Sequence, residues 1–186
     1  MITLPSPKDR RLLFNTQVTQ DSIGALSKQI LEIVDDDDYI KSVYSIHNLV
    51  YTPDPIKIYI DSYGGAVYQG FGLLGIMENS KTPIHTLVTG CAMSCGFLIS
   101  IAGHERMAYK SATFMYHQIS AIKVGTLKDI EEDVIEAKRL QEMIEKFTVS
   151  HTKISIDRLK QVYETKQDWY LNAEEALKYG IIDKII

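Results

Sequence analysis

Residues 88–99 read VTGCAMSCGFLI and combine the end of a strand, a serine and the start of a helix. A β-favouring run leads into this segment, small residues surround Ser94, and an apolar run long enough for a buried helix follows. The first backbone N–H groups of a helix have no partner inside the helix, so they point toward such a serine. Ser94 therefore fits two roles, a nucleophile beside an oxyanion hole or an ordinary helix N-cap. The segment is not the G-x-S-x-G elbow of α/β-hydrolases, because Ala92 replaces the first glycine.

The preceding segment repeats the same order of strand, small residues and helix. Residues 56–60 (IKIYI) predict a strand that runs into Gly64 and Gly65, and an apolar helical face follows. Adjacent glycines let the backbone approach closely and turn its N–H groups outward, although a plain tight turn explains them equally well. The alternation predicts an α/β fold with a parallel sheet, in which both glycine-containing turns open at the carboxyl edge of the strands.

The remaining segments predict helices and strands on both sides of this unit. The acidic run at residues 35–38 is interpreted as a solvated turn, and residues 39–55 carry no clear pattern. We expect strands at 12–14, 84–88, 106–109, 113–116, 167–171 and 181–186, and helices at 22–34, from Thr126 over about six turns, from Ser155 to Glu164, and from Asn172 to Gly180.

The composition is typical of a globular protein of one domain. The chain has 186 residues, 45% of them hydrophobic and 24% charged, and its net charge of −4 argues against a nucleic-acid partner. No apolar run reaches about 18 residues, so no membrane span is expected, and residues 1–11 do not resemble a secretory signal. Cys91 and Cys95 are expected to be packing residues of a cytoplasmic protein, and not a disulfide or a metal pair.

Three polar residues at the ends of predicted elements are candidates for a catalytic triad. Ser94 follows one strand, His117 follows another, and Asp168 lies at the start of a third. A histidine at a strand end is by itself more often a structural hydrogen-bonding group than a base. The order Ser, His, Asp also differs from the orders of chymotrypsin, subtilisin and the α/β-hydrolases, so those folds are not indicated.

Four motifs in one order resemble those of the ClpP family of serine peptidases. The motifs are SYGG at residues 62–65, GCAMSCG at 90–96, MYHQ at 115–118 and DWYLNAEEA at 168–176. The resemblance runs from about residue 11 to residue 186 and includes the spacing between the motifs. It implies a crotonase-like ClpP fold of stacked βαβ units, formed by residues 1–186 as one peptidase domain, with a projecting handle helix at about 125–150.

The resemblance also implies a role for each site residue. Ser94 would be the nucleophile, His117 its general base, and Asp168 the carboxylate that orients the imidazole. The backbone N–H groups of Gly65 and Cys95 would form the oxyanion hole. The implied reaction is the hydrolysis of peptide bonds in unfolded polypeptides through an acyl-enzyme, with no metal and no cofactor in this subunit.

The same resemblance implies an assembly and a cellular location. Members of the family form heptameric rings that stack as a tetradecamer and enclose the active sites in a chamber. An AAA+ unfoldase partner would use ATP to unfold the substrate and feed it into this chamber. The expected location is the cytoplasm, which is the host cytoplasm for a phage-encoded member, or the stroma or matrix of an organelle.

The sequence departs from the family pattern at four places. Residues 1–10 are shorter than the usual N-terminal segment that gates the pore and engages the unfoldase, and residues 35–55 are longer than the usual connection. Gln167 replaces an arginine that joins the two rings, and residues 119–123 lack the common Pro-Leu-Gly-Gly. These differences predict a divergent member with altered partners.

Two other functions remain open from the sequence. A crotonase-type acyl-CoA enzyme would share the fold and a backbone oxyanion hole, but would not need the three residues Ser94, His117 and Asp168. A non-catalytic ClpP-like structural subunit would be expected to have lost at least one of them. The chain retains all three.

Overall fold

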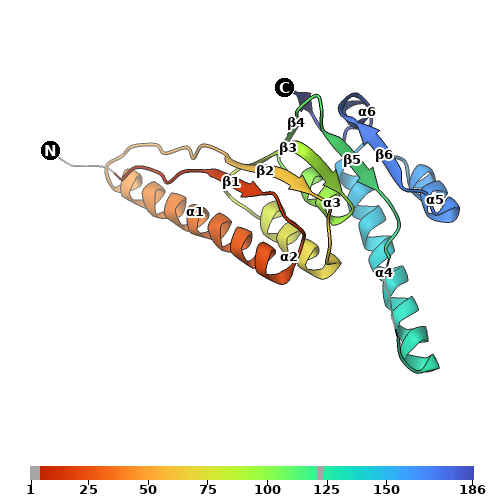
Figure 1. The fold of residues 1–186 in the computed structure, drawn as a ribbon. Coiled ribbons are helices and arrows are strands. Elements are labelled where there is room, and N and C mark those ends of the chain that lie inside the picture. The colour runs from red at the N-terminus through yellow and green to blue at the C-terminus, as the bar shows by residue number, and fades with distance from the viewer. Residues whose placement is uncertain (1–4, 121–123) are drawn as a thin grey trace.

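The computed structural model describes residues 5–120 and 124–186, and Figure 1 shows how their helices and strands are arranged. The described residues form a seven-stranded sheet. Its strands are β1 (Arg11–Phe14), β2 (Ile56–Ser62), β3 (Ile84–Met93), β4 (Glu105–Ala108), β5 (Thr113–Tyr116), β6 (Trp169–Asn172) and β7 (Lys184–Ile185). The order is β1-β2-β3-β4-β7, with β5 paired to the last part of β3 and β6 paired to β5.

The strand pairs confirm the expected α/β class. The pairs β1–β2, β2–β3, β3–β4, β3–β5 and β4–β7 are parallel, and β5–β6 is antiparallel. The helices are α1 (Gln20–Ile46), α2 (Val67–Glu78), α3 (Cys95–Ile101), α4 (Leu127–His151), α5 (Ile156–Thr165) and α6 (Ala173–Lys178). A helix therefore connects β1 to β2, β2 to β3 and β3 to β4, as βαβ units require.

Helices cover one face of β1, β2 and β3, and the main core lies between these two layers. The side chains of β2 alternate, so that Ile56, Ile58 and Ile60 are completely buried while Lys57 is exposed. α1 and α2 lie along this side of the sheet (Figure 1). All seven residues of α3 are buried, which fits an apolar helix packed behind the carboxyl end of β3.

The side chains expected at the helix starts act as N-caps. Thr126 forms a capping box with Asp129 at the start of α4, and Asn172 forms one with Glu175 at the start of α6. The hydroxyl of Ser155 accepts the backbone N–H of Arg158 at the start of α5. These local rules placed three helix starts correctly from the sequence.

The long helix α4 confirms the handle expected at about residues 125–150. Its N-terminal half projects away from the body of the molecule (Figure 1), and the apolar side chains of Leu127, Ile130 and Val134 are 74%, 41% and 47% exposed. The C-terminal half packs against the domain, where Leu140 and Ile144 are buried. One continuous stripe is therefore covered at one end and uncovered at the other.

The acidic run at residues 35–38 is not a solvated turn, and the helix expected to end at residue 34 continues to Ile46. Asp37 follows Ile33 by four residues and precedes Ile40 by three, so it lies on the buried face of α1. Only 4% of Asp37 is exposed. The expectation was wrong because a distant cation compensates the charge, which the local sequence does not reveal.

Two of the segments that depart from the family pattern are described only in part. Residues 1–4 of the segment 1–10 and residues 121–123 of the segment 119–123 lie outside the described residues.

That cation is Arg10, which precedes β1. Its guanidinium forms an ion pair with Asp37 and also donates to the carbonyl of Asp54. The hydroxyls of Thr82 and Tyr51 donate to the same carboxylate at 2.6 and 2.7 Å. Burial opposes the ionisation of Asp37, but the hydrogen bonds from Arg10, Thr82 and Tyr51 outweigh it and lower the pKa of this carboxyl.

We expect Asp37→Asn to lower the free energy of unfolding at pH 7 by about 3–5 kcal/mol, because it leaves the buried Arg10 cation without a counter-charge. Since the pKa of Asp37 is lowered by folding, its stabilisation is present above the unfolded-state pKa and is lost as the pH falls through the folded-state pKa. The deficit of the variant should therefore shrink below about pH 4. Urea unfolding at several pH values measures both effects.

Asp38→Asn is the matched control, because Asp38 pairs with Lys81 at 3.0 Å with both side chains largely exposed. We expect this control to change the stability by less than about 1 kcal/mol. Equal effects of the two substitutions would show that the buried pair has no special weight in the fold.

Candidate active site

The pairing of β3, β5 and β6 brings the three predicted triad residues to one place. Met93 of β3 lies opposite Met115 of β5, so Ser94 leaves the sheet near the end of β5. β5 and β6 are antiparallel, with Tyr116 opposite Trp169. The next position of this ladder places His117 opposite Asp168. β3 extends to Met93, five residues beyond its predicted end, and this extension carries Ser94 to the site.

Ser94 does not act as the side-chain cap of α3. Its φ and ψ are 53° and −121°, and its hydroxyl makes no capping hydrogen bond. Its backbone N–H donates to the carbonyl of Met115 at 2.9 Å, which holds the turn against β5. A serine at positive φ is a strained residue of the kind that concentrates at functional sites. Of the two roles that the sequence left open, the Ser94 hydroxyl does not fill that of a cap, although the residue stands at the N-cap position of α3.

The imidazole of His117 lies between the other two side chains. Its Nε2 is 2.8 Å from Ser94 Oγ, and its Nδ1 is 3.5 Å from the nearer carboxylate oxygen of Asp168. The His117 side chain is 23% exposed and that of Asp168 is 56% exposed. The second distance is longer than a normal hydrogen bond, so Asp168 pairs with the imidazole less tightly than Ser94 does.

The turn with Gly64 and Gly65 lies beside Ser94, as expected for two turns at the same sheet edge. Gly65 has a φ of 146°, and a Cβ at this position would lie 2.3 Å from the carbonyl oxygen of Val18. A Cβ on Gly64 would lie 2.9 Å from the backbone nitrogen of Cys95. Glycine is therefore required at both positions, and the turn approaches the start of α3 closely.

Cys95 contributes its backbone to the site, and its thiol points away from it. As the first residue of α3 it has an N–H outside the hydrogen bonding of the helix, next to Ser94. Its sulfur packs against α2, close to Gly70. Burial raises the pKa of the Cys95 thiol to about 12, and burial together with Asp61 raises the pKa of the Cys91 thiol to about 11. Both cysteines are free and buried, as expected for packing residues, and neither forms a thiolate at neutral pH.

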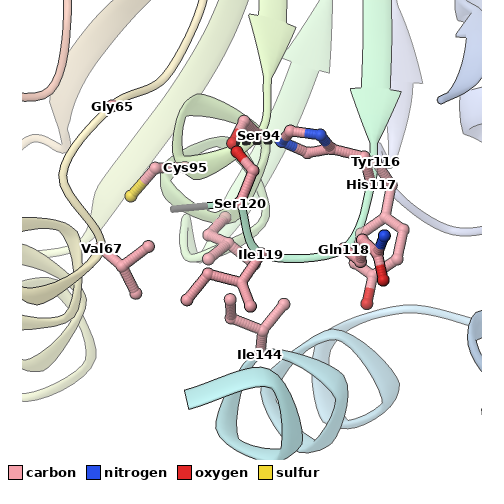
Figure 2. Close-up of a pocket in the computed structure, with 11 residues that line it drawn as sticks. Gly65, Val67, Ser94, Cys95, Tyr116, His117, Gln118, Ile119, Ser120 and Ile144 are labelled. Atoms are coloured by element: carbon pink, nitrogen blue, oxygen red, sulfur yellow. Dashed lines mark hydrogen bonds between the residues drawn. The ribbon is translucent and has the colours of Figure 1, made fainter. Parts of the chain in front are cut away.

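A small cleft opens beside Ser94, and Figure 2 shows the side chains around it. Val67 and Cys95 lie on one side, the segment from His117 to Ser120 lies on the other, and Ile144 of α4 closes the cleft from below in this view. The walls combine apolar side chains such as Val67 and Ile144 with polar ones such as Gln118 and Ser120, and the Ser94–His117 pair lies at the rim.

Two residues near the site make contacts that the sequence did not predict. Asp61 accepts the N–H of Cys91 at 2.9 Å, where the pairing of β2 and β3 shifts its register. Gln141 interrupts the apolar stripe of α4 and is nevertheless buried. A polar residue inside such a stripe was the available signal for Gln141, whereas nothing in the local pattern indicated Asp61.

Residues 5–120 and 124–186 contain no group of three or more His, Cys, Asp or Glu side chains that could hold a metal ion. The helices within the same two ranges are too short or too polar to cross a membrane.

The chain matches a known family and several characterised relatives. The profile of the family described as Clp protease matches residues 8–186. The ATP-dependent Clp protease proteolytic subunit of Deinococcus radiodurans is 35% identical over 133 residues, which are 70% of this chain and 64% of the relative. Proteolytic subunit 2 of Treponema pallidum is 28% identical over 88% of this chain and 79% of its own length. Proteolytic subunit 2 of a Synechococcus strain is 29% identical over 96% of this chain and 84% of its own length.

The chain belongs to the Clp protease family. This membership confirms the expected family, the α/β ClpP fold and the class of serine endopeptidase. It also disfavours an acyl-CoA enzyme of the crotonase type. The geometry brings together Ser94, His117 and Asp168, with Gly65 and Cys95 beside them, in this member of the Clp protease family.

The turn beside Ser94 should not tolerate a side chain at Gly65. We expect Gly65→Ala to lower the free energy of unfolding by about 1–3 kcal/mol, because the alanine must keep a glycine conformation against the carbonyl of Val18. Gly72→Ala within α2 is the control, since a Cβ there meets no atom within 4 Å. The control should raise stability by about 0.4–1 kcal/mol. Urea unfolding of both variants decides the point, and an unchanged stability of Gly65→Ala would contradict the strained turn.

Proposed function

We propose that the protein hydrolyses peptide bonds of unfolded polypeptides through a triad of Ser94, His117 and Asp168. The observation that carries the proposal is the position of the Ser94 hydroxyl, which lies 2.8 Å from His117 Nε2 and not over the start of α3. A serine hydroxyl is a weak nucleophile unless an adjacent base takes its proton, and this contact supplies that base.

The reaction follows from the positions of these groups. Ser94 Oγ attacks the substrate carbonyl while its proton passes to His117 Nε2, and Asp168 near Nδ1 orients the ring and stabilises the imidazolium. The N–H groups of Gly65 and Cys95 donate to the oxyanion that forms. His117 then gives the proton to the leaving amine, and an ester remains on Ser94. A water molecule activated by His117 hydrolyses this ester and restores the free hydroxyl.

The site geometry favours this function over its alternatives. An acyl-CoA enzyme would use the backbone donors of Gly65 and Cys95, but has no need of the strained Ser94 or of its contact with His117. A structural subunit without activity has no reason to keep all three side chains within reach of one another. Neither alternative accounts for the positive φ of Ser94.

We expect Ser94→Ala to abolish both the cleavage of small fluorogenic peptides and labelling by a fluorophosphonate. The wild-type protein should carry the probe on Ser94 alone, because only an activated serine reacts readily. Mass spectrometry of the labelled protein identifies the modified residue, and a peptidase assay measures the rate.

The matched control for this experiment is Ser42→Ala, which removes an exposed serine hydroxyl of α1. This variant should retain most of the activity and the probe labelling. Wild-type activity or undiminished probe labelling in Ser94→Ala would reject Ser94 as the nucleophile.

We further propose that this single peptidase domain acts within a homo-oligomer, as two heptameric rings stacked into a chamber. The uncovered apolar stripe on the projecting half of α4 supports this, because exposed apolar side chains at this spacing require a partner surface. An AAA+ unfoldase would use ATP to deliver substrate, while this subunit needs no cofactor or metal. Cys91 and Cys95 as free thiols fit a reducing location, and we propose the cytoplasm.

We expect Ile130→Asp to split the assembly and to remove peptidase activity at the same time, since it buries an unpaired charge in the contact. Glu132→Asp is the control: it introduces an aspartate, as Ile130→Asp does, but on the opposite side of α4. It should leave both the assembly and the activity unchanged. Analytical ultracentrifugation with parallel peptidase assays measures the two effects. A fully active monomer, or dissociated Ile130→Asp with full activity, would refute the link between assembly and catalysis.

A further inference from the structure

Gln141 is a buried polar residue on the apolar face of the handle helix α4. Its exposed fraction is 4%, and its neighbours along the same face include Leu140, Ile144 and Thr148, which are also buried. Burial of an amide is unfavourable unless its oxygen and its N–H groups find partners. The partners of Gln141 therefore indicate why an amide occupies this position.

The Gln141 amide binds the chain on both sides of His117. Its Oε1 accepts the backbone N–H of Ile119 at 2.9 Å, and its Nε2 lies 3.3 Å from the hydroxyl of Tyr116. Tyr116 immediately precedes His117, and Ile119 follows it by two residues. One side chain of α4 thus contacts both ends of the short segment that carries the imidazole.

The orientation of this amide is fixed by Glu145, one turn further along α4. Gln141 Nε2 donates to the Glu145 carboxylate at 2.8 Å. Because an ionised carboxylate only accepts hydrogen bonds, the NH₂ group must face Glu145 and the oxygen must face Ile119. Burial and the nearby Glu145 raise the pKa of Tyr116, so its phenol remains neutral and accepts the third contact.

The sheet no longer supports the chain where Gln141 binds it. β5 ends at Tyr116, and the following residues leave the sheet. The same residues form the wall of the cleft, where Gln118, Ile119 and Ser120 lie opposite Val67 and above Ile144 (Figure 2). A displacement of this segment would therefore shift both the imidazole and the surface that receives the substrate.

We propose that Gln141 is a positioning residue, which aligns His117 with Ser94 through its hydrogen bonds to Ile119 and Tyr116. This inference rests on the catalytic role proposed for Ser94 and His117. Through Gln141 the handle helix determines the position of the base and of the cleft wall at residues 118–120. The residue does not touch the reacting atoms, so its effect is exerted through the alignment of His117.

The first variant is Gln141→Met, which keeps the approximate volume and removes every hydrogen bond of the amide. The measurement is the rate constant for acylation of Ser94 by a small fluorophosphonate, which reports on the Ser94–His117 pair without filling the cleft. A misplaced catalytic group loses up to about a hundredfold in rate, and we expect a loss of about tenfold or more. A residue with a purely structural role would lower the unfolding temperature and leave this rate unchanged.

The second experiment exchanges the two polar side chains. Gln141→Glu alone places two carboxylates at hydrogen-bond distance and should be slow at neutral pH, with relative activity rising toward acidic pH as one of them takes up a proton. The double variant Gln141→Glu/Glu145→Gln restores an acceptor for Ile119 and a donor–acceptor pair between the two positions. We expect it to recover most of the wild-type acylation rate.

Two outcomes would overturn the proposal. One is a wild-type acylation rate in folded, assembled Gln141→Met, and the other is a double variant that remains as slow as Gln141→Glu alone. Both comparisons use wild-type protein whose probe is shown to be on Ser94. If the probe labels another residue in the wild type, the proposed function fails, which is a result distinct from the failure of the role of Gln141.

Discussion

The position of β5 between β3 and β6 is the constraint on which the site depends. Ser94, His117 and Asp168 are distant in sequence, and none of them lies inside a strand. Each is instead the residue next to a strand end, and the backbone ladders Met93–Met115 and Tyr116–Trp169 determine where those ends meet. A shift of one residue in either ladder would turn the side chains to the other face and separate the groups. Main-chain hydrogen bonds between these strands therefore determine where the three side chains meet.

Backbone strain at Ser94 is tolerated because its surroundings are rigid. A non-glycine residue in such a conformation costs about 1–3 kcal/mol and persists only where neighbouring structure holds it. Here α3 is buried along its whole length, and the Ser94 N–H is bound by β5. At the opposite end of the domain, the buried Arg10–Asp37 pair joins the start of β1 to the middle of α1. The scaffold thus supports the strained Ser94 with a continuous apolar core and a buried ion pair.

Local patterns revealed most strands and helix starts, and the errors have a common physical cause. The alternation in β2 and the caps of α4, α5 and α6 depend on neighbours a few residues away, which the sequence displays directly. The length of α1 depends on Asp37 meeting Arg10, and the choice between cap and nucleophile for Ser94 depends on its distance from His117. Such contacts join residues far apart in the chain. The four motifs and their order indicated that Ser94, His117 and Asp168 would lie together, because such motifs represent those contacts indirectly.

The handle helix shows why a polar contact is suited to linking assembly with catalysis. Its projecting half carries exposed apolar side chains, and its buried half lines the cleft with Ile144 and binds the backbone of the cleft wall through Gln141. Apolar contacts such as that of Ile144 are non-directional, so they hold the helix by packing without fixing the angle between two particular groups. A hydrogen bond tolerates only a narrow range of distance and angle. The bond from Ile119 to Gln141 therefore couples a small movement of α4 to the segment that carries His117 at a defined distance and angle, which an apolar residue at the same position would not impose.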